Sequence, residues 1–139
     1  MNKFVAIYFL SAVAMAVYGQ EQSAFLDCAT TQFKSMFVNI TYIDGSKKCV
    51  EGNEDLINFI DSIENKIKES KVFYDEEADS VEKYDTLLKN AECVLEENNK
   101  LQSKVSELGD EATTNCIAAE LDKATTRINN ALACKEKKE

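Results

Sequence analysis

The chain has 139 residues, a formal net charge of −9 at neutral pH, and no histidine or proline. Such a negative charge argues against nucleic-acid partners, because binding to a phosphate backbone depends on cationic side chains. The lack of histidine removes the commonest general base and the commonest zinc ligand. We therefore expect a protein that is not an enzyme, with no catalytic residues, no metal ligands and no cofactor.

The first nineteen residues have the pattern of a secretory signal peptide. Lys3 supplies a positive start, residues 4–17 carry no charge, and the small residues Val17 and Gly19 come just before an expected cleavage site at Gln20. A spanning helix needs about 20 apolar residues, which argues against a membrane anchor. We predict a secreted, extracellular protein whose mature part, residues 20–139, is a single domain.

The mature part is predicted to be helical, because it contains three glycines and no proline to interrupt a helix. A helical apolar period predicts a first helix over residues 22–40. Residues 41–52 lose this period and contain Asp44-Gly45, so we expect a loop there with a tight turn. Asn53 and Asp110 are expected to cap later helices.

Residues 53–108 carry apolar stripes that fit either one long rod or two helices. The second stripe runs through Leu88 and Leu95 and shifts by one position before Leu101. A change from lysines to acidic residues favours a turn near residues 72–74, since opposite charges stabilise the two ends of a helix. We therefore predict an all-α, disulfide-linked bundle of about four helices, with a long antiparallel coiled-coil-like hairpin in the C-terminal half.

Five cysteines lie in the predicted mature part, and none forms a Cys-x-x-Cys pair, so they are predicted to link distant elements. Helices that turn near residues 45, 74 and 109 would place Cys28 level with Cys134, since each helical residue advances about 1.5 Å. Cys49 would then lie near the end that holds Cys93 and Cys116. We predict Cys28–Cys134 and, by a small margin, Cys49–Cys93. Cys116 would be the free or intermolecular thiol.

Two short motifs are candidates for chemistry. Asn39-Ile40-Thr41 is an acceptor triplet for N-linked sugar, which predicts a glycosylation site at Asn39 and leaves its occupancy open. Ser80 and Lys83 match a serine-lysine dyad. Asp79 lies four residues before Lys83, however, and this spacing favours an ordinary solvated ion pair on a helix surface.

The aromatic side chains offer the most specific functional hypothesis. Aromatic residues usually fill a core, but a pocket between facing helices is the alternative, since helical bundles bind ligands there. The candidate pocket residues are Phe25, Phe33, Phe37 and Phe59.

The predicted export signal, the proline-free helical body and the segment from Cys116-Ile117 to Leu132-Ala133-Cys134 resemble small insect secreted proteins of the tsetse EP-like group. The resemblance implies a secreted helical protein of an epithelial fluid without established catalysis. Our leading hypothesis is a non-catalytic binding or interaction protein that meets a small apolar ligand or another extracellular protein. The alternative is an oligomeric structural coiled-coil protein, a homodimer for example, in which residues 53–108 form one rod.

Overall fold

The computed structural model describes residues 24–138, which form helices joined by short turns. No strand occurs among these residues, so the predicted all-helical class is confirmed. In chain order the elements are a first helix over residues 24–38, α2 (Tyr42–Cys49), α3 (Glu54–Glu76), α4 (Val81–Ser106), α5 (Glu111–Leu132) and a closing 3-10 helix, η1 (Ala133–Lys138).

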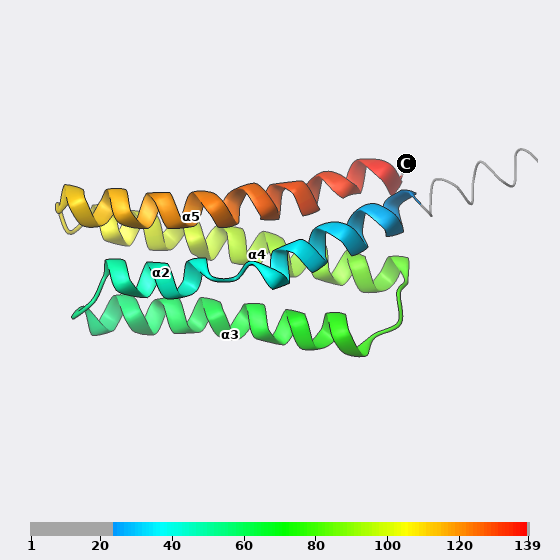
Figure 1. Ribbon diagram of the computed structural model, residues 1–139, viewed down its shortest axis with the longest axis horizontal. Helices are drawn as coiled ribbons and strands as arrows, with labels where there is room; N and C mark the ends of the chain where they lie inside the picture. Colours follow the sequence, from blue (N-terminus) through cyan, green and yellow to red (C-terminus); the bar gives the residue numbers. More distant parts are fainter. Residues whose placement is uncertain (1–23, 139) are drawn as a thin grey trace, which may run out of the picture.

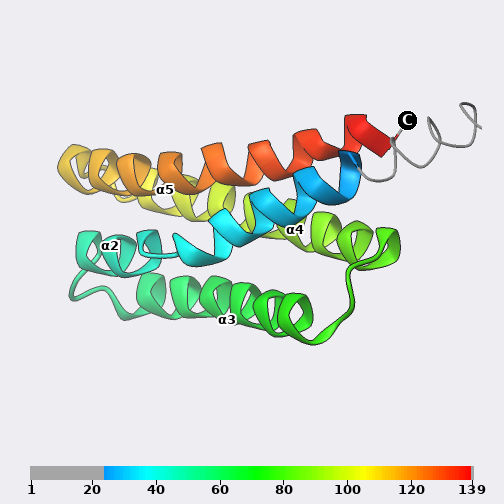
Figure 2. The same cartoon turned by 45° about the vertical axis from the view of Figure 1, so that its right-hand side comes forward.

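The helices are arranged as a bundle in which each layer is one helix or one pair of consecutive helices, and successive layers run antiparallel (Figure 1). The first helix and α2 run in the same direction and make one interrupted layer, which we call the strap and which spans residues 24–49. Helices α3, α4 and α5 are the other layers, and each reverses the direction of the one before it. Both views place the start of the strap at the same end of the bundle as the end of α5 (Figure 2).

The joints between the helices follow the local sequence. The side chains of Asn53, Ser80 and Asp110 each accept a hydrogen bond from a backbone N–H in the first turn of the next helix, at 3.1–3.2 Å. The caps predicted at Asn53 and Asp110 are therefore confirmed. Gly52 and Gly109 precede two of these caps with φ of 89° and 76°, a conformation that glycine adopts without strain.

Two predicted boundaries are wrong. Residues 41–52 are not a loop, because α2 occupies most of this segment and Gly45 lies inside the helix rather than in a turn. Helix α3 continues through the turn predicted at residues 72–74 and ends at Glu76, and α4 starts at Val81. Residues 53–108 are therefore two helices, and the single rod of the alternative hypothesis is wrong.

The apolar stripes of the helices meet in one core. The stripes predicted for α3 and α5 are both buried in it. On α3 the buried members are Leu56, Ile60, Ile63 and Ile67, and on α5 they are Ile117, Leu121, Ala124, Ile128 and Ala131.

The predicted signal peptide, residues 1–19, lies outside the described residues. Within residues 24–138, no helix is both long enough and apolar enough to cross a membrane.

Candidate functional site

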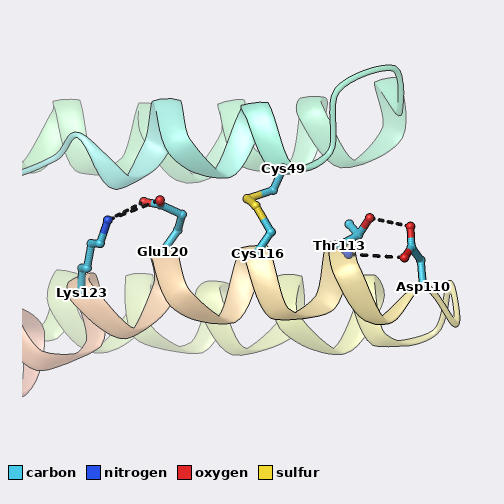
Figure 3. The surroundings of a disulfide bond; sticks show 6 residues. All are labelled: Cys49, Asp110, Thr113, Cys116, Glu120 and Lys123. Carbon is cyan, nitrogen blue, oxygen red and sulfur yellow. Dashed lines mark hydrogen bonds and ion pairs between the residues drawn. A yellow bond between two sulfur atoms is a disulfide. The ribbon is translucent and has the colours of Figure 1, made fainter.

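Two disulfides fasten the two ends of the strap to α5 and to the η1 helix that follows it. Cys28, in the first helix, bonds to Cys134, just after α5, and Cys49, at the end of α2, bonds to Cys116 on α5. The Cα atoms are 5.7 Å apart in each pair, which is ordinary disulfide spacing. Figure 3 shows the second bond crossing directly from α2 to α5.

The pairing of Cys28 with Cys134 is confirmed, whereas the predicted Cys49–Cys93 bond is wrong. Cys49 is the last residue of α2, so it belongs to the strap, which packs on α5 at this point. Cys116 is consequently bonded, and Cys93, on the exposed face of α4, is the free cysteine among the described residues.

A small cavity lies beneath the interruption of the strap. Its volume of about 20 Å³ is enough for one water molecule. Its wall is mostly apolar, with a few amide and hydroxyl groups and one guanidinium. The lining residues on the strap include Met36, Phe37, Asn39, Ile40 and Tyr42, and those on the other layers include Ile67, Leu87, Ala91, Val94, Ala124, Arg127 and Ile128.

Side chains hold the interruption in place. Asn39 Nδ2 donates to the Ser35 carbonyl oxygen at 2.8 Å, and the Asn39 carbonyl oxygen accepts from Arg127 Nη1 at 3.2 Å. Thr41, at the start of α2, makes no side-chain capping bond. Helix α2 has eight residues, and helices shorter than about 12–15 residues are marginal in isolation, so α2 depends on packing and on its disulfide.

The predicted aromatic pocket does not form as such. Of the four candidate phenylalanines, only Phe37 lines the cavity. Phe25 and Phe33 are fully buried against Tyr84, with ring centroids 6.5 and 6.0 Å from the Tyr84 ring. Phe59 is half-buried on α3, with Lys104 Nζ 5.5 Å from its ring centroid. The rings of Phe25 and Phe33 therefore fill the core.

Two alanines and one arginine at this cavity were missed as site residues. Ala91 on α4 and Ala124 on α5 lie on predicted apolar stripes, and their short side chains leave space between the helices. Small residues facing each other on two stripes were the available signal. For Arg127 the sequence offered no signal beyond its being the only arginine in the chain.

A buried lysine closes the turn between α3 and α4. Lys83 Nζ donates to the Glu77 carbonyl oxygen at 2.9 Å and to Asp79 at 3.0 Å, and it lies 4.6 Å from the Tyr74 ring centroid. The predicted ion pair with Asp79 is therefore confirmed, but the Lys83 side chain is 4% exposed, so its solvated position on a helix surface is wrong. The Lys83 hydrogen bond holds the pKa of Asp79 below its usual value. The Ser80 hydroxyl caps α4. Ser80 and Lys83 therefore both stabilise the turn between α3 and α4.

Buried tyrosine hydroxyls should make the fold sensitive to alkali. Burial raises the pKa of both Tyr42 and Tyr84 from 10.0 to about 12, although Asn98 and Thr30 partly oppose the shifts. Between pH 10 and 12 the unfolded chain ionises while the folded chain does not. Stability is therefore complete below pH 10 and falls by up to about 1.4 kcal/mol per pH unit for each tyrosine.

Urea unfolding at pH 9, 10 and 11, in a Cys93→Ala background that prevents disulfide exchange, measures this slope. Tyr42→Phe should make the decline with pH shallower. An unchanged decline in Tyr42→Phe would contradict the shifted pKa of Tyr42.

Among residues 24–138, no group of three or more acidic or cysteine side chains is placed to hold a metal ion. Comparison of the chain with protein-family models, curated proteins and solved structures finds no match. The resemblance to the tsetse EP-like group therefore stays a prediction. The fold and the site together define a helical bundle with a disulfide-pinned strap over an apolar cavity.

Proposed function

We propose that the protein is secreted and acts outside the cell as a non-catalytic binder of a small apolar ligand, held in the cavity under the strap. The observation that carries the proposal is the position of the cavity in the bundle. Its apolar wall lies at the interruption of a layer whose two ends are fixed by disulfides. Ligand sites in helical bundles form between facing helices with apolar walls, as here.

The ligand enters by movement of the centre of the strap, because the cavity as it stands holds only about one water molecule. Met36 and Ile40, both half-buried, lie on the strap side of the cavity. Methionine is flexible and adapts to irregular spaces. The disulfides keep the two ends of the strap on α5 and η1 while its centre moves.

Helices α4 and α5 form the rigid wall of the proposed site. We propose that they pack as a coiled-coil-like hairpin, which the three- and four-residue spacing of their buried positions supports. The buried positions on α4 include Tyr84, Leu87, Ala91, Val94, Asn98, Leu101 and Val105.

Asn39 at the cavity is proposed to carry an N-linked sugar. The residue is half-buried, and its Nδ2 donates one proton to the Ser35 carbonyl oxygen. Glycosylation replaces one of the two amide protons, so the other can keep this bond. Mass analysis of the protein from its native fluid, before and after enzymatic removal of N-glycans, tests the proposal.

Filling the cavity should weaken ligand binding. Ala124→Met adds a flexible side chain where Ala124 now leaves space. The affinity for the neutral fluorescent probe N-phenyl-1-naphthylamine should fall by about tenfold or more, equivalent to about 1.4 kcal/mol. Titration of the oxidised protein with the probe, followed by its fluorescence, measures the change.

Ala119→Met is the matched control, since Ala119 lies exposed on the same helix. This variant should bind the probe as the unaltered protein does. Absence of saturable binding to the unaltered protein, or equal loss in both variants, would refute the cavity as the binding site.

The alternative function, a structural oligomer, now depends on Cys93. This cysteine is free and exposed on α4, so it is the residue that could bridge two chains. Gel filtration and a non-reducing gel separate the alternatives. A compact monomer favours the binder, and a thiol-sensitive dimer that Cys93→Ala abolishes favours the oligomer.

A further inference from the structure

Arg127 is the only arginine in the chain, and it lines the cavity. It projects from α5, and its guanidinium donates one hydrogen bond, from Nη1 to the Asn39 carbonyl oxygen at 3.2 Å. A guanidinium has five N–H donors, so four remain for a ligand or water, given that no other bond to it occurs within residues 24–138.

Within residues 24–138, no carboxylate forms an ion pair with Arg127. The chain has 25 aspartates and glutamates, yet every ion pair among the described residues is made by a lysine. Among the described residues that line the cavity, none is acidic, and Arg127 is the one charged group. A half-buried cation beside an apolar wall therefore lacks an anionic partner within the described part of the protein.

We infer that the cavity takes an amphiphile with a single aliphatic chain and a carboxylate head, and that Arg127 binds the head. This inference rests on the proposed function, because it names the ligand class of the same site. The planar fork of a guanidinium matches the two oxygens of a carboxylate. A head with one negative charge fits better than a dianionic phosphate, since the net charge of −9 opposes each further negative charge.

A comparison of two ligands that differ only in the head tests the inference. Decanoate and decan-1-ol are titrated against the oxidised protein by displacement of N-phenyl-1-naphthylamine. The unaltered protein should bind decanoate about tenfold more tightly than decan-1-ol, because hydrogen bonds to charged groups are the stronger kind. Arg127→Met should remove this preference by weakening decanoate binding about tenfold more than decan-1-ol binding.

Lys123→Met is the matched control, since Lys123 lies one turn earlier on α5 and its side chain is 59% exposed. It should keep the preference for decanoate. Arg127→Lys retains the charge but not the fork and should bind decanoate with intermediate affinity. The circular dichroism of each variant verifies its helical fold.

Equal affinity of the unaltered protein for decanoate and decan-1-ol would overturn the inference and leave the proposed apolar binder standing. The same holds if Arg127→Met weakens both ligands equally, which would make Arg127 a structural support of the strap. If neither ligand nor the probe binds, the proposed function fails together with the inference.

Discussion

Replacement of Cys28 and Cys134 by alanine should lower the free energy of unfolding by about 4 kcal/mol. The bond spans 106 residues and encloses the Cys49–Cys116 bond, which spans 67, so the outer bond closes a further loop of 106 − 67 = 39 residues. A loop of this size falls between the about 15- and 100-residue cases that give about 3 and 4.7 kcal/mol. Urea unfolding followed by circular dichroism measures the loss.

The inner bond provides the comparison. Replacing Cys49 and Cys116 by alanine should cost a similar free energy, but it should also expose the backbone amides of α2 to hydrogen exchange, since this eight-residue helix is held by that bond. Cys93→Ala is the control and should change stability little, because Cys93 is exposed and unbonded. A loss below about 1 kcal/mol for either pair would contradict the chain-entropy argument.

The helical class followed from the helical apolar period and the absence of proline, and the outer disulfide followed from the antiparallel order of the helices. The prediction of the second disulfide was wrong because of one local feature, Gly45. Glycine usually interrupts a helix, yet here it lies inside α2, where an ideal Cβ would come within 2.5 Å of the Glu120 carboxyl group on α5. Gly45 therefore leaves room for the end of the Glu120 side chain. The chain first reverses at residues 50–53 and not near residue 45 as predicted, so Cys49 lies beside α5.

Most of the stripe predicted for α4 is buried, including Leu88 and Leu101, but it was misplaced at Leu95 because a nearby core position is polar. The structure buries Leu87 and Val94 and continues through Asn98 without the predicted shift of one position, whereas Leu95 is only partly buried. Asn98 is 1% exposed, and its amide lies 3.4–3.5 Å from the Tyr42 hydroxyl oxygen, within hydrogen-bonding range. A buried amide with a partner from another helix cannot be recognised from spacing alone.

The cavity and the burial of Lys83 were beyond prediction for the same reason. Each depends on how side chains from different helices meet, such as Ala91 with Ala124 or Lys83 with Tyr74. The sequence placed both alanines on apolar stripes, but only the packing shows that the space between them remains unfilled. Lys83 has the spacing of a surface ion pair, but the ring of Tyr74, across the turn on α3, and that of the adjacent Tyr84 lie beside its ammonium group.

Tyr84→Ala should be among the most damaging core substitutions, with a loss of about 4 kcal/mol in the free energy of unfolding, as for other large aromatic residues cut to alanine. The Tyr84 side chain is fully buried, and its ring lies 6.0–6.5 Å, centroid to centroid, from the rings of Phe25, Phe33 and Tyr74. These rings belong to the first helix and α3, so Tyr84 joins three layers of the bundle.

Tyr84→Phe separates the contribution of the ring to stability from that of the hydroxyl. The hydroxyl donates to Asp79 at 2.8 Å, and it therefore accepts from Thr30 at 3.0 Å. Phenylalanine keeps the ring packing and loses both bonds, and since the Asp79 side chain is 60% exposed, water can replace its lost partner. The expected loss is about 1 kcal/mol. If urea unfolding showed equal losses for the two variants, the hydrogen bonds rather than the aromatic packing would hold this end of the bundle together.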